Sequence, residues 1–198
     1  DVNYQQTGES TSINNMGMRA MQARAFESRN SQYLLLKAPP ASGKSRALMF
    51  LGLDKIHNQG LSKVIVAVPE RSIGGSFANT KLSESSFFAD WDIKPENNLC
   101  TAGGDKSKVK AFKRFMDGSD QILVCTHATL RFAFEELDDS VFNNTLVAID
   151  EFHHVSADAD NILGNVLKAL MDNSSAHIVA MTGSYFRGDS VPILDTAD

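Results

Sequence analysis

Cysteine and long apolar runs are scarce in this sequence, and each shortage excludes a class of protein. Only two cysteines, Cys100 and Cys125, occur in 198 residues, and they lack the spacing of a disulfide-stapled secreted domain or of a Cys-x-x-Cys metal site. We expect a reduced, buried thiol rather than a disulfide. No stretch reaches eighteen consecutive apolar residues, and the first thirty positions lack a charged-then-apolar signal pattern. The sequence therefore predicts a cytoplasmic protein without a membrane partner.

An excess of positive charge is also missing. The formal net charge is −5, from 19 Lys and Arg against 24 Asp and Glu, so the chain as a whole has no general attraction for nucleic acid. One local basic stretch contains Lys106, Lys108, Lys110, Lys113 and Arg114. It could contact phosphates, but the solvated face of a helix is the simpler interpretation.

The order of polar and apolar segments predicts one α/β domain. Residues 1–15 are rich in Asn, Gln, Ser and Thr and predict a polar N-terminal tail, whereas residues 16–198 alternate short apolar runs with amphipathic stretches. Predicted strands lie at 33–36, 64–68, 121–125, 146–149 and 178–181. Predicted helices lie at 18–29, 44–58, 106–116, 129–137 and 159–171. Nearly continuous apolar runs are typical of parallel strands covered on both faces, so we expect a mostly parallel sheet of about five to seven strands.

The segment 83–99 has the least regular pattern of the chain. It contains the aromatic residues Phe87, Phe88 and Trp91. We expect these side chains to pack on the surface of the core, with contact to a partner as the alternative.

A candidate phosphate loop follows the first predicted strand. Residues 38–45 read Ala-Pro-Pro-Ala-Ser-Gly-Lys-Ser and precede a predicted helix, which fits the phosphate-binding pattern if alanine replaces its first glycine. The expected contacts to ATP are the main-chain N–H groups of Ala41, Ser42 and Gly43, the ammonium of Lys44, and the hydroxyl of Ser45 through Mg²⁺. The alternative is an ordinary strand-to-helix turn that happens to contain a lysine.

A pair of carboxylates ends another predicted strand. Asp150 and Glu151 follow the apolar run 146–149, and in a parallel sheet this edge also carries the phosphate loop. Asp150 can hold Mg²⁺ through its water shell, while Glu151 can accept a proton from an attacking water. The adjacent His153 and His154 could suggest zinc, but they point to different sides of an extended chain and no other Cys or His has ligand spacing.

These residues carry a resemblance to the superfamily two helicases. The segment Asp150-Glu-Phe-His153 resembles their Asp-Glu-x-His motif, and Arg19-Ala-Met-Gln22 resembles the upstream motif whose glutamine reads adenine. Val68-Pro-Glu-Arg71 and Thr126-His-Ala-Thr-Leu130 resemble the motifs that follow the second and third strands. The segment 182–189 is similar to the Thr-Gly-Thr-Pro-Phe-Arg segment of the type III restriction enzyme res subunit and DNA-repair branch. The resemblance extends from residue 19 to about residue 189.

The resemblance implies a three-layer RecA-like P-loop NTPase domain and a role for each motif. The implied catalytic residues are Lys44, Asp150, Glu151 and His153, and the implied adenine contacts are Arg19 and Gln22. The implied nucleic-acid contacts are Pro69, Arg71, Thr126 and His127. We add Gly103 and Gly104 because they should emerge at the same edge of the sheet, where main-chain amides can hold phosphates. Thr182, Ser184 and Arg187 are implied to couple nucleotide and nucleic acid. Ordinary alternatives remain: Thr126, Thr182 and Arg187 could be capping or surface residues, and Gln22 could be solvated.

The resemblance also implies partners. It favours DNA, with RNA possible, together with a second RecA-like domain and nuclease or modification subunits. Because that second domain supplies arginines to the transferred phosphoryl group, we expect residues 1–198 alone to hydrolyse ATP very slowly. The rival interpretations are a nucleotide-dependent switch or scaffold that unwinds nothing and a small-molecule phosphotransferase.

Overall fold

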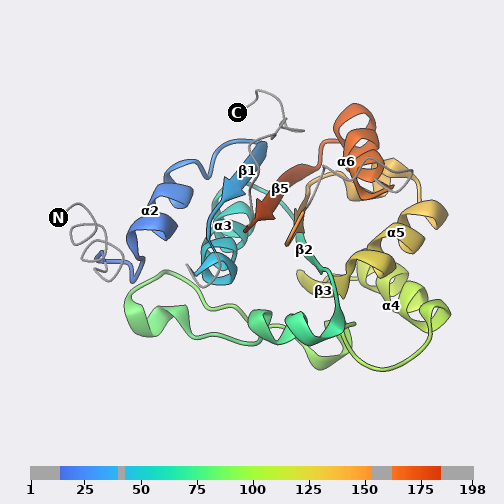
Figure 1. The fold of residues 1–198 in the computed structure, drawn as a ribbon, viewed down its shortest axis with the longest axis horizontal. Helices are drawn as coiled ribbons and strands as arrows, with labels where there is room; N and C mark the ends of the chain where they lie inside the picture. Colours follow the sequence, from blue (N-terminus) through green and yellow to red (C-terminus); the bar gives the residue numbers. More distant parts are fainter. Residues whose placement is uncertain (1–13, 40–42, 153–161, 184–198) are drawn as a thin grey trace.

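A computed structural model describes residues 14–39, 43–152 and 162–183 (Figure 1). The strands are β1 (Tyr33–Lys37), β2 (Lys63–Val68), β3 (Ile122–Thr126), β4 (Thr145–Ile149) and β5 (His177–Thr182). The α-helices are α2 (Ala20–Glu27), α3 (Lys44–Asn58), α4 (Asp105–Asp117), α5 (His127–Glu136) and α6 (Ile162–Asn173). Short 3₁₀ helices are η1 (Arg71–Phe77), η2 (Leu82–Ser85), η3 (Pro95–Asn97) and η4 (Asp139–Phe142).

The sheet that these residues form has five strands in the order β1-β5-β4-β2-β3. Every neighbouring pair is parallel, which confirms the predicted α/β class and the mostly parallel sheet. Each predicted strand agrees with an observed one to within one residue at either end. Because all strands run the same way, their carboxyl ends lie at one edge of the sheet, where ligands bind in open α/β sheets.

Helix bounds differ from the prediction at several ends. Helix α2 is shorter than predicted, and α5 begins two residues earlier than predicted, because Thr126 caps its first turn. Helix α6 extends two residues further than predicted. The predicted start of that helix, at 159–161, lies outside the described residues.

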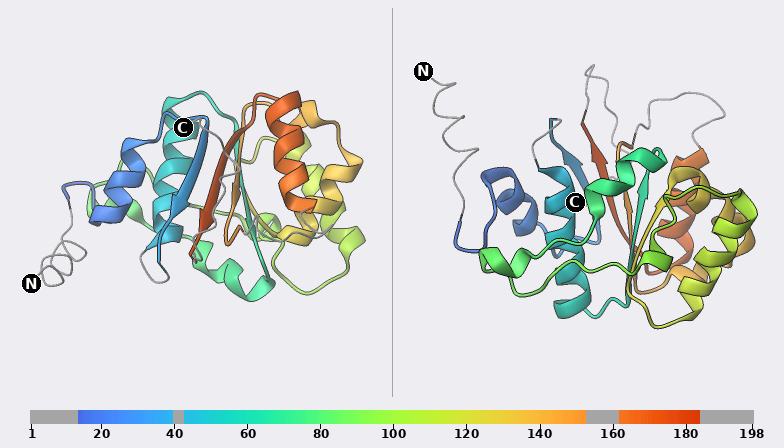
Figure 2. Two further views of the ribbon diagram at one scale, coloured as in Figure 1. Left: turned by 45° about the horizontal axis from the view of Figure 1, so that its top comes forward. Right: turned by 90° about the horizontal axis from the view of Figure 1, so that it is seen from below.

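Helices cover both faces of the sheet and produce three layers (Figure 2). On one face, α2, α3 and the segment 71–98 bury an apolar cluster that includes Phe50 and Trp91. On the other face, α4, α5 and α6 bury a second cluster that includes Phe112 and Leu167. Strands β2 and β4 are buried along their whole length, which is why their sequences read as continuous apolar runs.

The irregular segment 71–98 belongs to the first of these layers. Phe87 and Trp91 are buried, and the indole N–H of Trp91 donates to the carbonyl oxygen of Phe77 at 3.0 Å. The expected packing is confirmed for these two aromatic residues. Phe88 is 49% exposed, and its ring packs against that of buried Phe87 at 4.1 Å and near His57 at 5.8 Å between centroids, so it lies on the surface of the core as expected.

Both cysteines are free thiols, as expected. Cys125 is fully buried in β3, and burial raises its pKa well above the ordinary value. Cys100 is half-buried, so the expectation of burial is correct only for Cys125.

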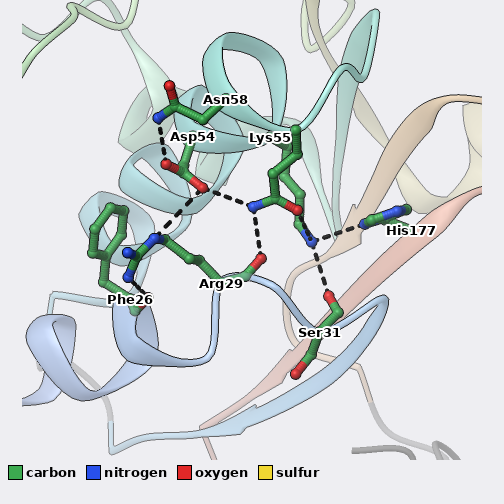
Figure 3. Close-up of polar contacts among 8 residues, drawn as sticks. Phe26, Arg29, Ser31, Asp54, Lys55, Asn58 and His177 are labelled. Carbon is green, nitrogen blue, oxygen red and sulfur yellow. Dashed lines mark hydrogen bonds and ion pairs between the residues drawn. The ribbon is translucent and has the colours of Figure 1, made fainter.

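The end of α3 remote from the phosphate loop is fixed by a polar cluster (Figure 3). The ammonium of Lys55 donates to the carbonyl oxygen of Ser31 at 2.8 Å and lies 2.8 Å from Nδ1 of His177. Asp54 accepts from Asn58 at 2.6 Å and lies 3.7 Å from Arg29. Burial lowers the pKa of Lys55 to about 8 and the pKa of His177 to about 4. The cluster joins α3 to the start of β5 and to the α2–β1 connection.

None of the helices in the described ranges is long and apolar enough to cross a membrane.

Candidate functional site

Gly43 is the N-cap of α3 and has a conformation that only glycine adopts freely. Its φ is 88°, in the left-handed region, and a Cβ built on it would lie 2.5 Å from Nε2 of Gln22. The loop therefore requires glycine for two separate reasons. Ser45 lies in the first turn of α3 and is half-buried. Ala41 and Ser42, the other predicted donors to phosphate, lie outside the described residues.

Gln22 attaches α2 to the phosphate loop. Its side chain is 2% exposed, its Nε2 donates to the carbonyl oxygen of Gly43 at 3.1 Å, and its Oε1 accepts from the main-chain N–H of Arg19 at 2.8 Å. The alternative of a solvated glutamine is therefore wrong, because the amide bridges two main-chain segments. Arg19 itself is exposed.

Lys44 lies where three strand ends meet. Its Nζ is 2.9 Å from Oε2 of Glu151 and 3.9 Å from Oδ1 of Asp150. A Cβ added to Gly183, which follows β5, would lie 2.9 Å from the same Nζ and 3.5 Å from Oε2 of Glu151. The order β1-β5-β4 explains this convergence, since the phosphate loop, residue 183 and the acidic pair follow three adjacent strands.

The two carboxylates have different surroundings. Asp150 is 7% exposed, and burial raises its pKa against the opposing effect of the Lys44 ammonium. Its Oδ1 accepts no hydrogen bond from the part of the chain that the structure describes. Glu151 is half-buried and has a φ of 53°, a left-handed conformation that costs a non-glycine residue about 1–2 kcal/mol. A buried, incompletely satisfied carboxylate beside a strained neighbour is typical of functional sites.

The residues of this site suit a cation that is bound partly by the phosphates of a nucleotide, rather than one bound entirely by protein side chains. Within the described ranges, no group of three or more His, Cys, Asp or Glu side chains could hold a metal ion. Magnesium in nucleotide sites usually takes one or two carboxylates and completes its shell with phosphate and water oxygens. The hydroxyl oxygen of Ser45 and the unsatisfied carboxylate oxygen of Asp150 are the protein oxygens that would bind such a cation.

A second cluster of charge lies between the segments that follow β2 and precede α4. Nη1 of Arg71 donates to the carbonyl oxygen of Thr101 at 3.3 Å, and Nζ of Lys108 donates to the same oxygen at 2.6 Å. Burial lowers the pKa of Lys108, and the charge of Arg71 lowers it further. Neither cation forms an ion pair with a carboxylate among the described residues, so two positive charges meet without a balancing anion.

Lys108 is the residue of this cluster that sequence reasoning missed. It is 8% exposed, so the solvated-face interpretation of the basic stretch is wrong at this position. Lys106, Lys110 and Arg114 are exposed, as that interpretation requires. The sequence signals for Lys108 are its place in that basic stretch and its distance of four residues from Gly104, the N-cap of α4.

The remaining predicted nucleic-acid contacts lie in the segments that follow β2 and precede α4 and at the junction of β3 with α5. Pro69 and the pair Gly103 and Gly104 are exposed. Thr126 is the N-cap of α5, where its Oγ1 accepts from the N–H of Thr129 at 3.2 Å, so the capping alternative is confirmed for this residue. Nε2 of His127 lies 2.8 Å from the carbonyl oxygen of Asp150, a contact that the sequence did not predict.

Of the predicted coupling residues, Thr182 lies within the described part of the chain. Thr182 ends β5, and its carbonyl oxygen accepts from the N–H of Ala38 at 3.1 Å. Predicted roles for His153, Ser184 and Arg187 concern positions outside the described residues.

Together, the parallel sheet and the meeting of Lys44 with Asp150 and Glu151 define a RecA-like nucleotide-binding domain. Residues 19–188 match the DEAD/DEAH box helicase family, and the chain belongs to that family.

Relatives agree with this assignment. The chain is 70% identical over 194 residues to YeeB of Bacillus subtilis (strain 168), a protein named as an ATP-dependent helicase. The match covers 98% of this chain and 32% of YeeB, so the chain spans about a third of that relative.

Solved helicase structures share the fold at low sequence identity. The Pyrococcus furiosus Hef helicase domain has a TM-score of 0.59 at 14% identity, covering 85% of this chain and 34% of that one. The Sulfolobus solfataricus SWI2/SNF2 ATPase core in complex with dsDNA has a TM-score of 0.55 at 18% identity, covering 89% and 34%. The UvsW helicase of bacteriophage T4 has a TM-score of 0.51 at 17% identity, covering 93% and 60%.

Proposed function

We propose that this chain is the ATP-binding core of a DNA helicase or translocase that moves along or opens DNA as it hydrolyses ATP. The observation that carries the proposal is the meeting of Lys44 with Asp150 and Glu151 beside Gly183. A phosphate site next to two carboxylates suits hydrolysis, because binding a cation and accepting a proton need separate groups. The name of YeeB supports ATP dependence, and the dsDNA in the SWI2/SNF2 structure supports DNA.

At the nucleotide, each residue has a distinct role in this proposal. Lys44 binds the β- and γ-phosphates, and its ion pair with Glu151 competes with them for the ammonium. Once released, Glu151 orients the attacking water and accepts its proton. Ser45 and Asp150 would hold Mg²⁺, which neutralises charge on the phosphates when it is bound. Gln22, which donates to the carbonyl oxygen of Gly43, and Arg19, whose main-chain N–H donates to Gln22, are the proposed adenine contacts.

The DNA lies, in this proposal, along the edge formed by Pro69, Arg71, Gly103, Gly104 and Thr126. The uncompensated charges of Arg71 and Lys108 supply attraction for phosphate, and the loop glycines leave room for the backbone to approach. Such contacts hold the strand without reading bases. Affinity should therefore fall steeply as salt rises, because each phosphate contact releases counterions.

The narrower features of the proposal rest on sequence. The segment 150–153 has the Asp-Glu-x-His form, which supports a DExH enzyme, and the segment 182–189 supports the type III restriction and DNA-repair branch. Thr182, Ser184, Arg187 and His153 would couple the two sites to a second RecA-like domain. A cytoplasmic location and nuclease or modification subunits complete the proposal.

Two measurements on the full-length protein test it. Calorimetric titration with a non-hydrolysable ATP analogue should show binding that Lys44→Ala removes. Strand displacement measured beside ATP hydrolysis should show DNA-stimulated turnover with unwinding or translocation. Unchanged affinity in Lys44→Ala contradicts the assigned phosphate site, and binding of both ligands without DNA-stimulated turnover would instead support a switch or scaffold.

A further inference from the structure

His127 connects two parts of the site that the sheet keeps apart. It begins α5 directly after β3, whereas the acidic pair follows β4, and β2 lies between these strands. Nε2 of His127 is 2.8 Å from the main-chain oxygen of Asp150. A carbonyl oxygen can only accept, so the ring N–H is the donor. The contact joins the proposed DNA edge to the acidic pair.

The group that His127 holds is the peptide between Asp150 and Glu151. On the other side of this peptide, the N–H of Glu151 hydrogen-bonds to the Asp150 carboxylate and lowers the pKa of that carboxyl. The N–H of Asp150 donates to the carbonyl oxygen of Ala67 at 2.8 Å, which fixes the preceding peptide to β2. Rotation of the 150–151 peptide would therefore move the N–H away from the Asp150 carboxylate and redirect Glu151 at the same time.

Glu151 needs outside support for its conformation. Its φ of 53° is unfavourable for a residue with a Cβ. The cost of that conformation and the net gain from one hydrogen bond are of similar size, so a single well-placed donor can decide how the peptide points. His127 is that donor in this structure.

We propose that His127 is a positioning residue that transmits occupancy of the DNA edge to the geometry of Asp150 and Glu151. The inference rests on the proposed function. Thr126, the neighbour of His127, caps the same first turn of α5 and is itself a proposed phosphate contact. A phosphate drawn to Thr126 shifts the turn that carries His127, and the shift reaches the 150–151 peptide through one hydrogen bond.

This role differs from the direct DNA contact expected from the sequence. Nε2 of His127 is directed at the main chain of Asp150, so it is not offered to a phosphate at the same time. Arg71, by contrast, is exposed at the edge. The two residues should consequently affect different kinetic constants.

The test compares His127→Ala, His127→Gln and Arg71→Ala in the full-length protein. We expect His127→Ala to lower turnover at saturating DNA and ATP by about tenfold, since a misplaced catalytic group costs at least that much. Its dissociation constant for DNA should change by less than about twofold. The amide N–H of His127→Gln can replace the ring N–H and should restore most of the turnover. Arg71→Ala should do the reverse, weakening DNA binding and retaining turnover at saturating DNA.

Two results overturn the proposal. If His127→Ala weakens DNA binding and keeps full turnover at saturating DNA, as Arg71→Ala should, His127 is a DNA contact. Unchanged binding and turnover would show that the hydrogen bond positions nothing.

If the proposed function is wrong, the result is different: the unmodified protein shows no DNA-stimulated hydrolysis. The positioning role is then decided by the amide resonance of Glu151 in protein labelled with ¹⁵N-glutamate. That resonance should shift in His127→Ala and return in His127→Gln. A resonance that does not move in His127→Ala overturns the proposal in this case too.

Discussion

Replacing Gly43 with alanine tests the attachment of the phosphate loop to α2. The left-handed φ of 88° costs alanine about 1–2 kcal/mol. The new Cβ would also lie 2.5 Å from Nε2 of Gln22, whose side chain is 2% exposed and hydrogen-bonded at both ends of its amide. Such overpacking costs about 1–3 kcal/mol. We expect Gly43→Ala to lower the free energy of unfolding by about 2–5 kcal/mol, the approximate sum of the two effects.

Gly60 provides a matched control for the backbone part of this cost. Its φ is 77°, and no heavy atom of the described residues lies within 4 Å of the position of an added Cβ. Gly60→Ala should therefore cost only about 1–2 kcal/mol. The difference in unfolding free energy between Gly43→Ala and Gly60→Ala measures the cost of the clash with Gln22.

A double-mutant cycle assigns that difference to its source. Gln22→Ala removes the clashing amide, so the combined Gly43→Ala and Gln22→Ala change should cost less than the sum of the single changes by about 1–2 kcal/mol. Urea unfolding gives the free energies, and calorimetry with a non-hydrolysable ATP analogue should show weaker binding by Gly43→Ala than by Gly60→Ala. Equal destabilisation by Gly43→Ala and Gly60→Ala, or strict additivity with Gln22→Ala, would refute the reasoning.

Three further predictions concern ionisable residues. Lys44→Ala should weaken binding of an ATP analogue by about tenfold or more while leaving the urea midpoint nearly unchanged, and tight binding by the variant contradicts this. Combining Arg71→Ala with Lys108→Ala should reduce the slope of log affinity for DNA against log salt by about two, and an unchanged slope places the DNA elsewhere. His177 has its pKa lowered to about 4 from 6.5, so the unfolded chain takes up the proton first, and stability should fall as pH falls from 6.5 to 4. For this half-buried ring the loss should be about 1–2 kcal/mol, and a His177→Asn variant with the same pH dependence would contradict it.

Local sequence predicted the elements of this fold but not their arrangement in the sheet. The P-loop helix α3 has the predicted bounds, because an apolar run, a glycine and an amphipathic stretch follow one another within a short segment. The insertion of β5 between β1 and β4 depends on contacts between residues far apart in the chain. Apolar runs of similar length carry no information about which neighbour each strand selects.

The same distinction applies to the site. That Lys44 meets Asp150 follows from a general property of parallel sheets, so motif order was sufficient to expect it. The contact of His127 with a main-chain oxygen has no sequence signature, since a carbonyl is present at every residue. Burial of Lys108 was missed for a related reason: a lysine on an amphipathic helix usually extends into solvent, whereas this one lies against the segment of Thr101 and Gly103.

The measurement that tests the central claim most directly is steady-state ATP hydrolysis by the full-length protein, with and without DNA, beside a Glu151→Gln variant. The side chains of Glu151 and glutamine have the same size, so the variant keeps the packing and removes only the group that accepts a proton. The account predicts hydrolysis that DNA stimulates and that Glu151→Gln abolishes, with ATP binding retained. Hydrolysis that is indifferent to DNA, or that survives in Glu151→Gln, would contradict the proposal that this chain is the core of a DNA motor.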